Sequence, residues 1–276
     1  MRDRVTLEIQ AEVAKFKAMG LEPKLGVILA GDGGPSKAYA LSKKKLAASL
    51  GIAMELVLLP ASARESEIVD SINKFNRDPL TRGILLELPL PPGVNQTEVL
   101  SRVDHAKDVD GSHPLNRGKL LRGDLESALL PVTPLSCLAL LESAAIPLKG
   151  QRVTVVGRGE TVGLPLAALL IKKDATVTVC HSRTVNLKEE IRRADIVVSA
   201  TGKAGLIQAG DLREGQVVLD AGINVLPDGS IVGDVSPTAR EVVAYLSPVP
   251  GGVGTLTTIL IMKNLLKAMR LASEPK

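Results

Sequence analysis

Apolar and polar residues alternate along the chain in blocks that predict helices and strands in turn. Val5, Ile9, Val13 and Phe16 recur at helical spacing, and the apolar run at 24–31 is typical of a buried strand. Later blocks predict helices at 35–50, 63–76, 96–103, 133–145, 163–172, 187–193 and 255–272, and strands at 54–60, 83–89, 152–157, 175–180, 195–200 and 216–220. Alternation of this kind predicts parallel strands joined by crossover helices.

The pattern predicts an α/β protein of two domains. The first is expected to cover 1–132 and the second, Rossmann-like and built on a parallel sheet, 133–254. We expect the last helix, within 255–276, to pack back onto the first domain, which would place a cleft between the two. The polar segment 104–130 is predicted to be a loop-rich site region.

Composition narrows the classes of partner. The 276 residues are 45% hydrophobic, which is enough for a large core. Aromatic residues make up only 1%, so nucleic-acid recognition by base stacking is not expected. A net charge of +4 favours an anionic partner only weakly.

The numbers of cysteines and histidines and the lengths of the apolar runs bear on the cellular compartment and on metal binding. Cys137 and Cys180 are the only cysteines, which fits a reducing, cytoplasmic setting. The charged, amphipathic N-terminus does not resemble a signal peptide, and no apolar run is long enough to predict a membrane span. Three scattered histidines predict no metal site.

The clearest motif is the glycine turn in "RVTVVGRGETVGLPLAALL". A β-branched strand leads into Gly157, Gly159 and Gly163, and an apolar helix starts at the last of them. Glycines in this context let backbone N–H groups approach a pyrophosphate at the helix N-terminus. The motif predicts a dinucleotide site, with a plain tight turn as the alternative.

The end of the next strand bears on which dinucleotide binds. NAD-binding folds usually carry an acidic residue there for the ribose 2′-hydroxyl. This chain has His181, Ser182 and Arg183 instead, with Arg158 in the glycine turn. Cations and a hydroxyl suit a 2′-phosphate, so NADP is favoured over NAD, unless Arg183 is only a surface charge.

Chemistry in the first domain is suggested by four features. Tyr39 and Lys43 share one face of a predicted helix at i, i+4 spacing. Glu87 lies near the end of an apolar strand, where an unpaired carboxylate is costly but where open α/β sheets bind ligands. "KDVDG" adds Asp108 and Asp110, and "PVPGGVG" adds adjacent glycines that allow close approach to a flat ligand.

These motifs together resemble one family. "SKAYALSKKK", "LELPLPPG", "KDVDGSHPLN", "VTPLSCL", "VVGRGETVGLP", "TVCHSRT", "DAGIN", "VGDV" and "SPVPGGVGTLT" occur in the order seen in the methylenetetrahydrofolate dehydrogenase/methenyltetrahydrofolate cyclohydrolase family. The resemblance runs from about residue 24 to the end. It implies a cytoplasmic, usually dimeric enzyme of one-carbon metabolism that acts on tetrahydrofolate derivatives with NADP.

The resemblance also implies roles for single residues. Lys43 would be the catalytic general acid and base, Tyr39 would orient the folate ring system, and Asp110 would anchor its pteridine. Folate contacts are further implied for Pro250, Gly251 and Gly252, and cofactor contacts for Gly157, Arg158, Gly159, Ser182 and Ile223, with Thr133 nearby.

The chain departs from the family pattern at several positions. Glu87 stands where the family usually has glutamine, and Gly159 stands where it has serine, so one hydroxyl is missing from the phosphate turn. Val132, Ser136 and Thr255 replace Cys, Gly and Pro. The change at Glu87 bears most on function, because this residue is expected to face Lys43 across the folate site.

Two states of Glu87 are open from the sequence. As a carboxylate it would pair with Lys43 and stabilise the charged amine, whereas as a protonated acid it would mimic glutamine in shape. We favour the ion pair, which predicts intact dehydrogenase activity and slow cyclohydrolase activity near neutral pH. The functional alternatives are a monofunctional dehydrogenase, a shikimate- or amino-acid-dehydrogenase-like oxidoreductase, and a non-catalytic NADP-binding protein.

Overall fold

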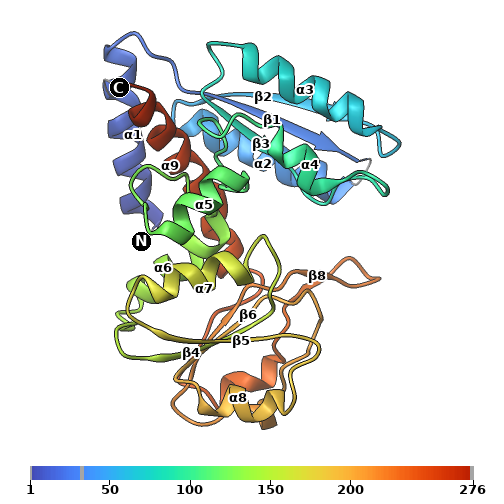
Figure 1. Ribbon diagram of the computed structural model, residues 1–276, viewed down its shortest axis with the longest axis vertical. Helices are drawn as coiled ribbons and strands as arrows, with labels where there is room; N and C mark the ends of the chain where they lie inside the picture. Colours follow the sequence, from blue (N-terminus) through green and yellow to red (C-terminus); the bar gives the residue numbers. More distant parts are fainter. Residues whose placement is uncertain (1, 32–33, 274–276) are drawn as a thin grey trace. The chain divides into compact units, whose positions relative to one another are not determined.

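The computed structural model describes residues 2–31 and 34–273 (Figure 1). The chain forms two compact units. One contains the residues up to Leu130 together with those from Thr258 onward, and the other is Pro131–Thr257. The predicted α/β class with two domains is confirmed.

The first unit is built on a three-stranded parallel sheet in the order β2-β1-β3. Its strands are β1 (Lys24–Ala30), β2 (Ala53–Leu59) and β3 (Gly83–Leu86). The crossovers run in opposite directions along the sheet. Right-handed connections therefore place α2 (Gly34–Ser49) and α3 (Glu65–Arg77) on opposite faces, as Figure 1 shows.

Helix α3 shows why these segments fold as they do. Ile68, Ile72 and Phe75 recur at helical spacing and are fully buried. The Phe75 ring lies so close to Gly26 of β1 that a Cβ there would sit 2.8 Å from it. At the C-terminal end of α3, the Lys107 ammonium donates to the main-chain carbonyls of Phe75, Asn76 and Asp78 and so satisfies the last turn.

The remaining elements of the first unit are helical: α1 (Arg2–Ala18), α4 (Gln96–Ser101), α5 (Pro114–Arg122) and the part of α9 (Val253–Ser273) from Thr258 onward. Asn264 of α9 donates to the carbonyls of Val109 and Leu130, at 2.8 Å each. This buried amide ties the last helix to two other segments of the same unit.

Two expectations about the first unit were wrong. The segment 104–130 is not simply irregular, because α5 lies inside it, with His113 as N-cap, Pro114 in the first turn and left-handed Gly123 as C-cap. These are standard helix signals that the polar composition obscured. Strand β3 ends at Leu86 rather than at 89, although Glu87 N still donates to Ile28 O.

The second unit carries a five-stranded, fully parallel sheet in the order β10-β7-β6-β4-β5, which confirms the predicted parallel sheet. Figure 1 shows α7 and α8 on opposite sides of it. The bounds are α6 (Val132–Ser143), β4 (Arg152–Val156), α7 (Gly163–Ile171), β5 (Thr176–Cys180), α8 (Leu187–Arg193), β6 (Ile196–Ser199), β7 (Val217–Asp220) and β10 (Tyr245–Leu246).

Several short elements of this unit were not expected from the sequence. They are the edge strand β10, an antiparallel ribbon of β8 (Asn224–Val225) and β9 (Ile231–Val232), and two 3₁₀ turns, η1 (Ala209–Asp211) and η2 (Pro237–Glu241). Strands of two residues leave no periodic pattern to read. Among the described residues, no helix combines the length and apolar character needed to cross a membrane.

Candidate active site

A buried lysine and a carboxylate meet in the first unit. Lys43 of α2 is only 4% exposed, and its Nζ donates to both carboxylate oxygens of Glu87, at 2.6 and 2.7 Å. The Glu87 side chain is 13% exposed. Two short contacts from one ammonium to both oxygens are the geometry of an ion pair. The pairing offsets the free-energy cost of burying either charge alone in the protein interior.

Tyr39 lies one helical turn before Lys43 on the same face of α2. The Lys43 ammonium sits 4.5 Å from the centre of the Tyr39 ring, within the range of a cation–π contact. The Tyr39 hydroxyl lies 3.4 Å from Thr258 Oγ1 of α9. The ring is nearly half exposed, so a flat ligand can reach it.

Asp110 is the third polar group of this region. Its carboxylate accepts a hydrogen bond of 2.8 Å from Ser112 Oγ. Burial raises the pKa of Asp110 to about 7; the Ser112 hydrogen bond and the Lys43 charge oppose this rise, and the nearby Asp108 adds to it. The predicted catalytic residues Lys43, Tyr39, Glu87 and Asp110 all belong to the first unit, where Lys43 contacts Tyr39 and Glu87 and its charge acts on Asp110.

The glycine turn of the second unit leaves room for a phosphate. Gly157 has φ +120°, and a Cβ there would overlap the Ala200 carbonyl oxygen at the end of β6. A Cβ on Gly163 would overlap Gly157 O, whereas nothing lies within 4 Å of one at Gly159. Because β4 and β6 are where the strand order reverses, this cradle lies at the edge of the sheet where Rossmann folds bind dinucleotides.

A buried carboxylate that the sequence analysis did not single out organises the same edge of the sheet. Asp234 accepts hydrogen bonds from Ser199 Oγ, from Thr201 N and Oγ1, and from Lys203 N and Asn224 Nδ2. Burial opposes its ionisation, but these hydrogen bonds hold the pKa of Asp234 below its usual range. An aspartate flanked by glycine and valine in "VGDV" was the available signal.

Matches to two models of protein domain families identify the family of this chain. Residues 1–110 match the catalytic domain of tetrahydrofolate dehydrogenase/cyclohydrolase, and residues 131–273 match its NAD(P)-binding domain. The chain belongs to the tetrahydrofolate dehydrogenase/cyclohydrolase family. The resemblance expected from the motifs is thereby confirmed.

Individual family members resemble the chain over nearly its whole length. The bifunctional protein FolD of Heliobacterium modesticaldum is 50% identical over 265 residues, which are 96% of this chain and 92% of that protein. The crystal structure of the bifunctional enzyme FolD from Campylobacter jejuni has a TM-score of 0.91 at 37% identity, with 97% and 95% of the two chains covered. The Trypanosoma brucei enzyme, in complex with NADP and an inhibitor, has a TM-score of 0.91 at 33% identity, with 99% and 96% covered.

The other residues expected to bind ligands lie in the second unit. Arg158, Gly159, Ser182 and Ile223 are exposed there. Thr133, in the first turn of α6, is partly buried. Gly251 has φ +109°, and a Cβ on Gly252 would overlap Pro248 O, so both glycines are needed by the backbone beside Pro250. The ligand contacts assigned to these residues stay predictions.

The raised pKa of Asp110 predicts how stability depends on pH. The folded protein keeps a proton on Asp110 up to about pH 7, whereas the unfolded chain releases it near 3.8. Between these values the folded state binds more protons, so stability present at low pH is lost as pH rises. When the pH is raised from 5 to 8, the unfolding free energy of the wild type should fall by roughly 2–3 kcal/mol more than that of Asp110→Asn.

Urea unfolding at both pH values measures this difference. Asp104→Asn, a change of the same kind at a more exposed aspartate nearby, is the control and should follow the wild type. Equal pH dependence in wild type and Asp110→Asn would show that Asp110 is ionised throughout.

Proposed function

We propose that this chain oxidises 5,10-methylenetetrahydrofolate to 5,10-methenyltetrahydrofolate with NADP and hydrolyses the product to 10-formyltetrahydrofolate. The observation that carries the proposal is that both domains of the family match this chain. Lys43, Tyr39 and Asp110 lie in motifs that resemble those of the family. The 50% identity to a bifunctional relative over 96% of the chain supports both activities. One-carbon metabolism of folates is then the setting.

The second unit is proposed to hold NADP. Gly157 and Gly159 would let the backbone approach the pyrophosphate, while Arg158 and Ser182 would meet the 2′-phosphate, with Ile223 and Thr133 nearby. When bound, NADP supplies the hydride acceptor for the oxidation. The open space at Gly159 and the close backbone approach at Gly157 suit a phosphate-bearing ligand.

The first unit is proposed to hold the folate. Tyr39 presents an exposed ring face for the flat ring system, and Asp110 anchors the pteridine. In the hydrolysis, water adds to the methenyl carbon and the ring C–N bond opens. Lys43 is proposed to take the proton that the water loses and to return one to the departing nitrogen.

One observation favours a second candidate, a dehydrogenase with weak cyclohydrolase activity. Both carboxylate oxygens of Glu87 hold the Lys43 ammonium, where the family usually has a neutral glutamine. An amine that donates to both oxygens of a carboxylate must give up at least one of these contacts before it can act as a base. Hydride transfer depends on positioning rather than on this proton, so oxidation is expected to persist.

Assembly and compartment are proposed from the family resemblance. We infer a cytoplasmic homodimer that acts on tetrahydrofolate derivatives and has no nucleic-acid or membrane partner. The mass of the chain is 29.0 kDa, so light scattering should report about twice that value if the dimer forms.

Lys43→Met tests the proton-transfer role. The variant keeps an apolar side chain of similar length but has no titratable group, so cyclohydrolase activity should fall by at least about 100-fold. NADP affinity, measured by fluorescence titration, should stay at the wild-type value. Lys44→Met, at the next and exposed position of α2, is the matched control and should retain activity. Wild-type hydrolysis of methenyltetrahydrofolate by Lys43→Met would remove Lys43 from the mechanism.

Arg158→Ala tests the cofactor assignment. A charge-assisted contact to the 2′-phosphate is worth about 1.5–3 kcal/mol, so NADP affinity should fall about 10-fold or more while NAD affinity changes little. Arg152→Ala, at the opposite end of β4, controls for the loss of positive charge. If titration shows equal losses for NADP and NAD, Arg158 does not read the 2′-phosphate.

A further inference from the structure

A second aspartate lies two residues before Asp110 and is more deeply buried. Asp108 is 3% exposed and continues the sheet edge, since Ile84 pairs with it as an isolated parallel bridge. Asp108 and Asp110 lie in one tight turn, closed by the hydrogen bond from Gly111 N to Asp108 O, and the Asp108 charge is near enough to raise the pKa of Asp110. Neither the motif roles nor the ion pair of Lys43 uses Asp108.

The chain folds back onto the Asp108 carboxylate. Its Oδ1 accepts a hydrogen bond from Ser112 N at 3.1 Å. Its Oδ2 accepts hydrogen bonds from His113 N at 2.8 Å and from Asn116 Nδ2 at 2.9 Å. Gly111, with φ +69°, makes the reversal possible. The turn 108–113 is therefore closed around a carboxylate, and Ser112, which this turn places, donates its hydroxyl to Asp110.

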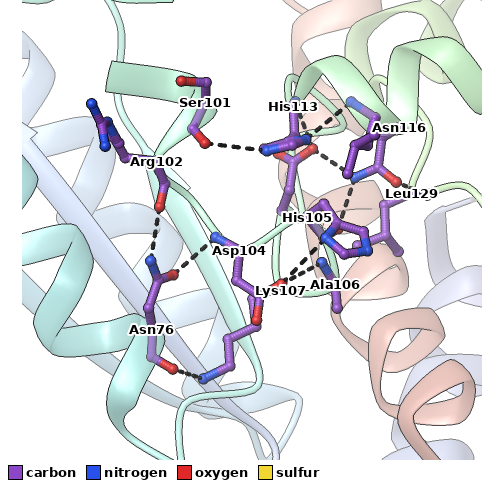
Figure 2. A network of polar contacts seen from close by, with 12 residues as sticks. Asn76, Ser101, Arg102, Asp104, His105, Ala106, Lys107, His113, Asn116 and Leu129 are labelled. Carbon is purple, nitrogen blue, oxygen red and sulfur yellow. Dashed lines mark hydrogen bonds and ion pairs between the residues drawn. The ribbon is translucent and has the colours of Figure 1, made fainter. Parts of the chain in front are cut away.

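Asn116 holds the Asp108 carboxylate in place. Its amide is 1% exposed, and besides Asp108 its Nδ2 donates to His105 O at 2.8 Å while its Oδ1 accepts Leu129 N at 3.2 Å. Figure 2 shows Asn116 joined to His105 and to Leu129, and, on the other side of the view, Lys107 reaching the carbonyl of Asn76. Every polar side-chain atom of Asp108 and Asn116 thus has a hydrogen-bond partner, which favours a single conformation.

We propose that Asp108 is the positioning residue for Asp110: it closes the turn that brings the Ser112 hydroxyl onto the Asp110 carboxylate and so fixes the pteridine-anchoring group before folate arrives. This inference rests on the proposed folate site and adds residues to it. Preorganisation of this kind lowers the cost of binding, because the anchor need not be ordered when the ligand binds.

Two variants test the proposal. In Asp108→Asn one oxygen becomes an NH₂ group that faces an N–H donor, so the turn should open. In the milder Ser112→Ala the turn remains but the hydroxyl on Asp110 is lost. We expect the Kd for tetrahydrofolate, measured by calorimetry, to rise about 10-fold or more in the first and about 3–10-fold in the second. Asp104→Asn and Ser127→Ala are matched controls, since Ser127 also donates to an aspartate, Asp124.

The kinetics separate positioning from a loss of folded protein. A merely structural defect lowers the active fraction and therefore kcat, and leaves KM for methylenetetrahydrofolate unchanged. Positioning of Asp110 predicts a raised KM with kcat within about threefold and unchanged NADP affinity. If Asp108→Asn does not fold, Ser112→Ala decides: unchanged Kd and KM in that variant would overturn the proposal.

Failure of the proposed function gives a different result. A wild type that binds tetrahydrofolate but does not turn over contradicts the function alone, and the Kd values of the variants still test the positioning. A wild type that does not bind tetrahydrofolate contradicts both.

Discussion

A lysine ammonium in the interior of a protein needs a partner, and the site of the first unit follows from how Lys43 is given one. Removing one member of such a pair typically costs 3–5 kcal/mol, because the other charge is left buried and unpaired. Glu87 supplies both of its oxygens from the end of β3, and Tyr39 supplies a ring face from one turn earlier in α2. Helix, strand end and ring are thereby fixed around one nitrogen atom.

The same pair sets the chemistry that the site can perform. A lysine that accepts a proton must present a free lone pair, whereas Lys43 Nζ donates to both oxygens of Glu87. Family membership and the close bifunctional relatives support both activities, so the two steps are expected to depend differently on Glu87. Oxidation requires that the ligands be held in place, whereas hydrolysis requires that Lys43 give up its proton.

The sequence was informative where a physical constraint leaves a periodic or chemically unusual trace. Ile68, Ile72 and Phe75 marked α3, and Gly157 and Gly163 marked the phosphate turn because no side chain fits at either position. A carboxylate in an apolar strand marked Glu87. The two-residue strands β8, β9 and β10 left no such trace, and α5 was hidden by its polar surface despite its cap residues.

The polar networks were the hardest part to read from the sequence. Asp108 and Asp234 accept hydrogen bonds from residues whose spacing becomes meaningful only once the chain has turned. The spacing in the sequence does not reveal these networks, because half of the donors are backbone N–H groups, which all residue types except proline have. Only in the folded structure are these carboxylates buried and hydrogen-bonded through several donors.

A pH–rate profile for hydrolysis of methenyltetrahydrofolate, recorded for the wild type and Glu87→Gln and corrected for uncatalysed hydrolysis, tests the role of the Lys43–Glu87 pair most directly. Replacing the carboxylate with an amide removes one of the two oxygens that hold Lys43, so the rate at pH 7 should rise, while methylenetetrahydrofolate oxidation persists in both proteins. If Glu87→Gln hydrolyses more slowly than the wild type at every pH, the carboxylate assists the lysine instead of restraining it.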